Sequence, residues 1–347
     1  MLYVFQNHGV LQRKVYRILY RILKMTERLI FFAALLILLF SVGGCPSGES
    51  RLPESPVVEA FESEAAVSEP NQIVLAENEP NASVTNELKP ESARLFHDKF
   101  AGILNGFVND KGMVDYKGLK REGASLRVLL EELNNLDPNE YRSWPEQDKA
   151  AFWINVYNLH KLYVVSINYP IQSSSRFLRV LWGPTDLRHI ENKISLYKFL
   201  VMDEEFTLKK VENRFFRAEF DDPRVLLAIT DACLSSPPLR NEPYYGYKLD
   251  EQLDNQVKRF LSDPIAFRID RQKKRLYLSA VFETGRYGRQ FLKKFDIDRK
   301  FKDHLPITRA VLNFVTNYIS TGDASFLEVG NYSVKYMSYD WTINDGS

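Results

Sequence analysis

Cysteine and histidine are scarce in this chain of 347 residues, which has two cysteines and five histidines. The sequence contains no CxxC, HxxxH or HExxH pattern, so no metal site is expected. The two cysteines do not form a disulfide framework, because Cys45 has a separate role described below. The formal net charge of +1 gives no reason to expect a nucleic-acid partner.

A largely apolar run of 14 residues from Leu29 to Val42 precedes the first cysteine. Its length suits the core of a signal peptide and falls short of the roughly 20 residues that a spanning helix needs. Val42-Gly43-Gly44-Cys45 resembles the lipobox of bacterial lipoproteins, in which the cysteine thiol is acylated and becomes the new N-terminus. The alternative is a plain signal anchor with an incidental cysteine. We predict a signal peptide and lipobox over residues 1–45, and a lipoprotein of the bacterial cell envelope that faces the periplasm or the exterior.

Residues 1–24 carry five basic residues and no acidic residue, which makes the basic region before the apolar run unusually long. Met25 would begin a signal peptide of conventional length. Our hypothesis is that Met25 is the true start, and detection of a peptide from residues 1–24 in the proteome would contradict it.

The stretch from Pro46 to Pro90 contains nine Glu and six Pro, with Arg51 and Lys89 as its only basic residues. Such a composition does not bury enough apolar surface to fold. We predict that residues 46–90 are a disordered acidic linker that holds a folded domain away from the membrane.

Hydrophobic periodicity in residues 91–347 predicts a single helix-rich α+β domain around a small sheet. Helices are expected over residues 92–108, over 126–133 with an end at Asp137-Pro138, over 207–217 with Thr207 as N-cap, over 249–261 and, as the last helix, from Pro306 to Tyr318. Strands are expected over residues 224–230, in a hairpin of 267–269 with 276–278, and over 334–341. A long loop is expected over residues 231–247. The helices and strands lack the regular βαβ alternation of a nucleotide-binding fold. No cofactor is expected.

The most distinctive stretch is AFWINVYNLHKLYVV, residues 151–165, which is apolar nearly all round a helix. Ser143 and Glu146 have the spacing of a capping box, Pro145 suits the first turn, and the helix should run to about Asn168. Burial on most faces leaves Asn155 and Asn158 in need of hydrogen-bond partners. These amides either tie down neighbouring loops or line a binding site.

Several stretches, taken together and in order, resemble the domain-of-unknown-function family 547. They are GMVDYKGL (112–119), AFWINVYN (151–158), TLKKVENRFFR (207–217), DDPRVLLAI (221–229), SSPPLRNEPY (235–244), LDEQLDNQVKRFLSDP (249–264), RLYLSAVF (275–282) and YMSYDWTIND (336–345).

The resemblance implies a site at which this chain departs from the family pattern. The family has a His after the Glu of the 207–217 helix, a His early in the strand, and two Cys in the loop that follows. That set resembles a papain-like or transglutaminase-like thiol site. In this chain Glu212 is kept, but Asn213, Leu226, Asp231 and Ser236 stand at the His and Cys positions. Leu and Asn do not act as general bases, and a serine without a base is a poor nucleophile.

The leading hypothesis is therefore a non-catalytic binding or scaffold protein. Its partners would be the membrane, through lipidated Cys45, and an unidentified envelope protein or polymer. The binding residues that we would expect are Asn155, Asn158, Glu212 and Asp231.

The runner-up is a thiol- or serine-type hydrolase or acyl-transferase with a rearranged site. It would use Ser236 or Cys233 as nucleophile with an acid such as Glu212 or Asp231, and His189 or His160 as base. A third hypothesis, a purely structural tether, predicts that no concave polar pocket lies beside Asn155 and Asn158.

Overall fold

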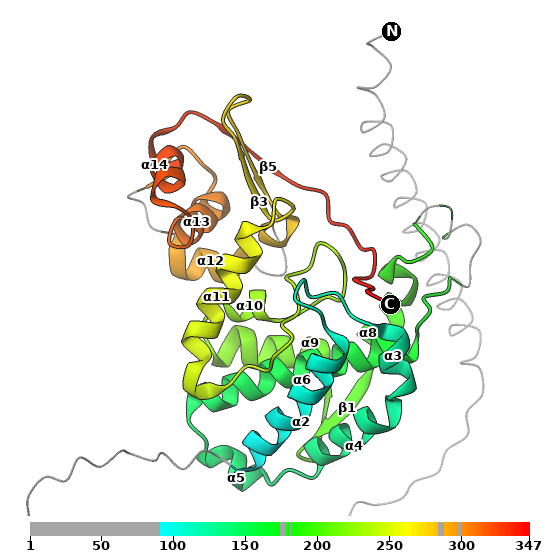
Figure 1. Ribbon diagram of the computed structural model, residues 1–347. Coiled ribbons are helices and arrows are strands. Elements are labelled where there is room, and N and C mark those ends of the chain that lie inside the picture. Colours follow the sequence, from blue (N-terminus) through cyan, green and yellow to red (C-terminus); the bar gives the residue numbers. More distant parts are fainter. Residues whose placement is uncertain (1–90, 174–177, 179, 181, 284–287, 297–299) are drawn as a thin grey trace, which may run out of the picture. The chain divides into compact units, whose positions relative to one another are not determined.

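The computed structural model describes residues 91–173, 178, 180, 182–283, 288–296 and 300–347, all within a compact unit from Ala82 to Ser347. The signal peptide, Met25, Cys45 and the acidic linker therefore lie outside the described residues. The described part is α+β, helix-rich with two small sheets, as the sequence predicts (Figure 1).

The first half of the unit is built around one long buried helix. Its helices are α2 (Glu91–Phe107), α3 (Tyr116–Arg121), α4 (Gly123–Asn134), α5 (Pro138–Ser143), α6 (Glu146–Ile167), η1 (Leu187–Ile190) and α8 (Glu191–Ser195). Helix α6 is buried on every side along most of its length, and it packs against α2, α3, α4 and α8. The helix predicted from its apolar residues is thus the central helix of this half.

A short hairpin leads into the segment that carries the family positions. Strands β1 (Lys198–Val201) and β2 (Glu204–Thr207) pair antiparallel, and α9 (Leu208–Val211), the π-helix η2 (Glu212–Glu219) and α10 (Val225–Ala228) follow. The Thr207 side chain accepts the Lys210 N–H, which confirms Thr207 as a helix N-cap.

In the described residues, the second half consists of a three-stranded sheet, four α-helices and two 3₁₀ turns. The helices are η3 (Gly246–Lys248), α11 (Leu249–Ser262), η4 (Ala280–Phe282), α12 (Gly288–Phe295), α13 (Pro306–Val315) and α14 (Thr321–Val329), of which η3 and η4 are single 3₁₀ turns. The predicted hairpin is confirmed as β3 (Phe267–Asp270) with β4 (Arg275–Leu278), and β5 (Ser333–Tyr336) adds to β4 in parallel. In Figure 1, α12, α13 and α14 lie together beside this sheet.

The chain after β5 leaves the sheet and crosses to the first half of the unit, where it ends near α3 and α8 (Figure 1). There it forms isolated bridges from Thr342 to Asp186, from Ile343 to Cys233 and from Asp345 to Val114. The Asn344 side chain is buried, accepts the Tyr116 hydroxyl at 2.9 Å and donates to the Gly112 carbonyl at 2.8 Å. This segment therefore joins three parts of the chain that are far apart in sequence.

The expected strand over residues 224–230 is wrong, because Val225–Ala228 is a helical turn. The Asp222 carboxylate accepts the Arg224 N–H and so begins a turn. The apolar run that follows is buried on all sides, and periodicity alone does not separate a short buried strand from a short buried helix.

Three other boundaries differ from expectation. Ser143 ends α5 and donates to the Glu140 carbonyl, so it does not cap α6, which begins after Pro145 without a side-chain cap. The helix from Pro306 ends at Val315, and a further helix, α14, follows it. The last strand ends at Tyr336, and the rest of the expected strand pairs only through isolated bridges.

Candidate functional site

The side chain of Asn155 binds the backbone of the loop before η3. Its amide nitrogen donates to the Tyr244 carbonyl at 2.8 Å, and its oxygen accepts the Tyr244 N–H at 3.0 Å. The same nitrogen lies 2.9 Å from His97 Nδ1. Asn155 thus satisfies both backbone groups of one residue, as a neighbouring strand would.

Asn158 does the same for the segment after α10. Its nitrogen donates to the Ala228 carbonyl and its oxygen accepts the Thr230 N–H, both at 3.0 Å. The expected strand is missing here, and the helix side chain supplies the hydrogen bonds that a neighbouring strand would have made. The two amides therefore hold the two ends of the loop between Thr230 and Tyr244.

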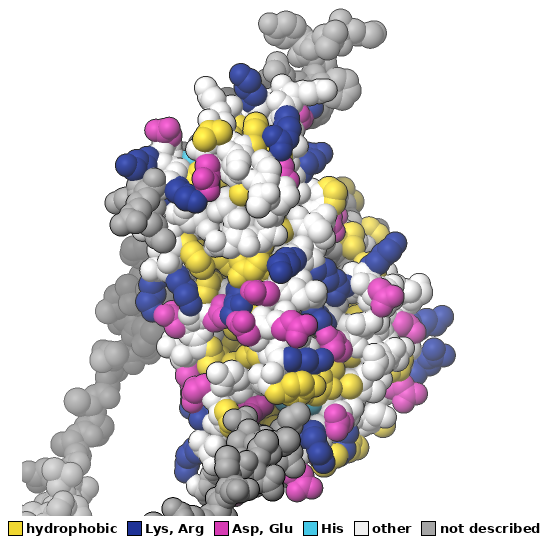
Figure 2. All heavy atoms as spheres, turned by 60° about the vertical axis from the view of Figure 1, so that its left-hand side comes forward, with side chains coloured by type: hydrophobic (Ala, Val, Ile, Leu, Met, Phe, Trp, Pro, Cys, Tyr) yellow, Lys and Arg dark blue, Asp and Glu magenta, His cyan; other side chains and the backbone are white. Residues whose placement is uncertain are grey.

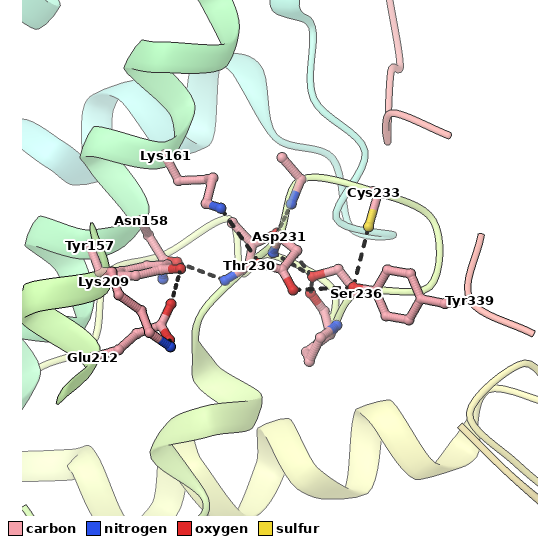
Figure 3. Close-up of polar contacts among 12 residues, drawn as sticks. Tyr157, Asn158, Lys161, Lys209, Glu212, Thr230, Asp231, Cys233, Ser236 and Tyr339 are labelled. Atoms are coloured by element: carbon pink, nitrogen blue, oxygen red, sulfur yellow. Dashed lines mark hydrogen bonds and ion pairs between the residues drawn. The ribbon is translucent and has the colours of Figure 1, made fainter. Parts of the chain in front are cut away.

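A cavity of about 240 Å³ lies beside α6, between α8, α9 and the chain after β5. Tyr157 and Lys161 reach it from one face of α6, and Glu212 and Asp231 enter from η2 and from the loop after α10 (Figure 3). The Tyr157 hydroxyl donates to Glu212 Oε1 at 2.9 Å, and Lys161 Nζ donates to Asp231 Oδ1 at 3.5 Å. The side chains of Lys161, Asp231 and Glu212 are at most 10% exposed. Buried charges of both signs thus converge on one cavity.

The π-helix η2 begins at Glu212 and places its carboxylate toward this cavity. Glu212 Oε2 lies 3.7 Å from Lys209 Nζ and 3.9 Å from Arg217 Nη2. π-Helices are rare in proteins, and those that do occur are often found at functional sites. In this chain Glu212 points into the interior while the next residue, Asn213, is exposed to solvent.

The two nucleophile candidates line a different cavity, of about 620 Å³. The Ser236 hydroxyl accepts the Asp231 N–H at 2.7 Å, donates to the Pro237 carbonyl at 3.1 Å and lies 3.3 Å from Thr230 Oγ1. Cys233 donates from Sγ to the Tyr339 hydroxyl at 3.3 Å. Burial raises the pKa of the Cys233 thiol to about 12, so the thiol is protonated at neutral pH.

The four positions at which the resemblance implies His or Cys do not line one cavity, although the Ser236 hydroxyl accepts the Asp231 N–H. Asn213 is exposed, Leu226 is fully buried in the core, Asp231 lines the smaller cavity and Ser236 lines the larger one. A Tyr339 hydroxyl links the two cavities, because it donates to Asp231 Oδ2 at 3.2 Å and accepts from Cys233. Glu212, the third catalytic candidate, is in the smaller cavity, apart from Ser236 and Cys233.

Neither histidine proposed as a base contacts a nucleophile. The His160 ring stacks on Phe199 with centroids 3.6 Å apart, and its Nδ1 lies 3.3 Å from the Tyr197 hydroxyl. His189 Nε2 binds the Gly183 carbonyl at 2.9 Å. Within the described part of the chain, no imidazole hydrogen-bonds to Ser236 or Cys233, and no group of three or more His, Cys, Asp or Glu side chains could hold a metal ion.

Burial of His97 predicts a pH-dependent stability. Desolvation lowers its pKa from 6.5 to about 4, so between these values the unfolded chain binds a proton that the folded chain does not. The free energy of unfolding should therefore fall as the pH drops from 6.5 toward 4, by about 1.4 kcal/mol per pH unit. The His97→Asn variant tests this, because an asparagine Oδ1 can still accept a hydrogen bond from Asn155. When the free energy of unfolding from denaturant titrations is plotted against pH, its slope should be smaller in this variant by about that amount.

His160 adds to the same slope, because burial lowers its pKa from 6.5 to about 3. Part of the pH dependence will therefore persist in the His97→Asn variant. Parallel profiles for this variant and the wild type between pH 5 and 6.5 would show that His97 makes no contribution.

Of the four binding residues expected from the sequence, Glu212 and Asp231 line the smaller cavity and Asn155 and Asn158 do not, whereas Tyr157, Lys161 and Trp341 line it without having been expected. A detectable pattern was present for Tyr157 and Lys161. A tyrosine and a lysine four residues apart lie on one face of a helix, and a lysine inside an otherwise apolar helix needs a buried acidic partner. Trp341 lies more than a hundred residues from the rest of the cavity wall, and no local pattern links it to them.

The fold and the cavity define a class: a helix-rich α+β domain whose buried central helix carries one side of a small charged cavity. Residues 141–261, from α5 to α11, match the family described as "Protein of unknown function, DUF547", so this part of the chain is similar to that family. No curated protein and no solved structure matches the chain. Along the described residues, no helix has the length and apolarity that crossing a membrane requires.

Proposed function

We propose that this protein is a lipid-anchored component of the bacterial cell envelope whose domain binds a partner or an envelope component without catalysis. The observation that carries the proposal is the state of the two nucleophiles. Ser236 is held by three hydrogen bonds within its own loop, and the Cys233 thiol is buried and hydrogen-bonded to Tyr339. In the part of the chain that the structure describes, no imidazole hydrogen-bonds to either side chain as an activating base would.

Binding explains the charged side chains of the cavity better than a purely structural role does. The structural alternative predicts no concave polar pocket next to the amides of α6. Tyr157 and Lys161 flank Asn158 on the same helix and line a cavity with buried charges. Enclosing charges in a concave site costs desolvation free energy, and such costs are typical of sites that recognise a polar ligand.

The sequence before the domain supports the anchor. Val42-Gly43-Gly44-Cys45 has the spacing of a lipobox, and the acidic, Pro-rich residues 46–90 have the composition of a flexible spacer. A lipid on Cys45 and a spacer of this kind would place the domain at a membrane surface while leaving its cavity accessible.

The anchor is tested by metabolic labelling with a fatty acid. The wild-type chain should incorporate the label, and the Cys45→Ser variant should lose it, because only a thiol at the lipobox accepts the diacylglycerol. The Cys233→Ser variant is the matched control and should label like the wild type, since Cys233 is buried in the domain. Equal labelling of wild type and Cys45→Ser would contradict the lipid anchor.

The non-catalytic assignment is tested separately against ester, amide and peptide substrates. We expect no turnover that depends on the two nucleophile candidates. Turnover that Ser236→Ala or Cys233→Ala abolishes, in a variant that remains folded, would replace the proposal with the hydrolase or acyl-transferase alternative.

A further inference from the structure

The smaller cavity carries equal numbers of positive and negative side chains. Its walls contain three basic and three acidic residues: Lys161, Lys209, Arg188, Glu212, Asp231 and Glu191. We propose that this cavity binds a small zwitterion, an α-amino acid or a dipeptide, through its ammonium and carboxylate groups. The inference rests on the binding role proposed above and specifies the chemical class of the ligand.

The charge balance favours a ligand with no net charge. Lys161, Asp231 and Glu212 are buried, so their charges are poorly screened by water. A net anion or cation would leave one charge in this cavity without compensation, which is costly at a buried site. An apolar ligand would displace water from three charged groups without replacing its hydrogen bonds. A zwitterion avoids both costs.

The ion pairs at this cavity are longer than charge-assisted hydrogen bonds usually are. Lys161 Nζ lies 3.5 Å from Asp231, and the two basic partners of Glu212 Oε2 lie 3.7 Å and 3.9 Å from it. Charge-assisted hydrogen bonds are usually about 2.7–2.9 Å long. A ligand carboxylate beside Lys161 and a ligand ammonium beside Glu212 would make such contacts, and Figure 3 shows these two side chains on either side of Tyr157 and Asn158.

The size of the cavity and its remaining walls suit a molecule of this class. A volume of about 240 Å³ corresponds to about eight water molecules, below the range of a drug-sized site. Apolar side chains complete the wall, namely Leu187, Ile194, Leu208 and Trp341. They would contact the carbon atoms that separate the two charged groups of the ligand.

The test is calorimetric titration of the full chain in detergent with four probes. L-leucine and L-alanyl-L-alanine are zwitterions, whereas N-acetyl-L-leucine carries only the carboxylate and L-leucinamide carries only the ammonium. We expect at least one zwitterion to bind, and blocking either charged group of leucine to weaken binding by about 10- to 100-fold, as expected for one charge-assisted hydrogen bond.

Variants locate the binding within the cavity. Lys161→Met should weaken zwitterion binding by about 10- to 100-fold, and Lys198→Met, at a lysine paired with Glu205 outside the cavity, should leave it unchanged. If Lys161→Met does not fold, the double variant Lys161→Met with Asp231→Asn removes both charges of the pair and should fold without binding.

Two results would overturn the inference, and they have different consequences for the proposed binding function. If a blocked probe binds as tightly as its zwitterionic parent and depends on Lys161, the cavity binds ligands of another class and the proposed binding function survives. If none of the four probes binds, the ligand class is wrong. The Cys45 labelling and the nucleophile variants still decide the proposed function independently.

Discussion

Replacing Trp153→Ala is expected to lower the free energy of unfolding by about 3–5 kcal/mol, the range for deletion of a buried indole. Trp153 is fully buried at the middle of the unit. Its ring stacks on Phe215 with centroids 3.8 Å apart and contacts Phe206 at 5.0 Å, and its Nε1 donates to the Tyr141 hydroxyl at 2.8 Å. Removing the ring would leave a cavity where α6, β2 and η2 meet.

Denaturant unfolding followed by circular dichroism measures this loss. Trp153→Phe keeps an aromatic ring against Phe215 but loses the hydrogen bond to Tyr141, so its cost should lie well below that of the alanine variant. Val128→Ala is the surface control, because Val128 is 55% exposed, and its effect should stay within about 0.5 kcal/mol. A cost for Trp153→Ala no greater than that of the surface control would contradict the central role of α6.

The second large effect is expected at Asn158. Asn158→Ala removes both hydrogen bonds to the segment after α10 and leaves the Ala228 carbonyl and the Thr230 N–H buried without those partners. Leaving a buried polar group unsatisfied costs about 1–3 kcal/mol, so we expect the variant to lose about 2–4 kcal/mol of stability. Amide hydrogen exchange at Thr230 should also accelerate, because the acceptor of its N–H is gone.

Asn168→Ala is the matched control for the Asn158 variant. Asn168 lies at the end of the same helix, and its amide donates to the Val164 carbonyl near the surface, where water can replace it. Its loss should cost about 1 kcal/mol or less. Unchanged exchange at Thr230 in Asn158→Ala would show that another group holds this segment.

Stretches whose hydrophobic period is long and unambiguous could be predicted from the sequence. Phe96, Phe100 and Leu104 recur at helical spacing and are all buried in α2, and the 249–261 helix and the β3–β4 hairpin were predicted for the same kind of reason. The strand predicted from Arg224 to Thr230 is wrong because this segment is uniformly apolar and buried, which removes the periodicity that distinguishes a helix from a strand.

The candidate site was predictable only in part, for a related reason. Glu212 and Asp231 could be proposed from the residues that the family resemblance singles out, and both line the smaller cavity. The expectation that Ser236 or Cys233 would share a site with Glu212 depended on distances across the fold, and the sequence carries no information on which side of a loop each residue faces. On the face shown in Figure 2, acidic and basic side chains are interspersed, so surface charge does not mark a site there either.

The segment after β5 also bears on the order in which the molecule assembles. Tyr116 and Asn344, which hydrogen-bond to each other, are 228 residues apart, and Leu187 N–H donates to the carbonyl of Trp341, a residue of the cavity wall. Contacts of such sequence separation carry a large loop-closure entropy and form late, whereas helices such as α2 and α6 form from local contacts. We therefore expect the charged cavity to be completed only after the helical core is in place.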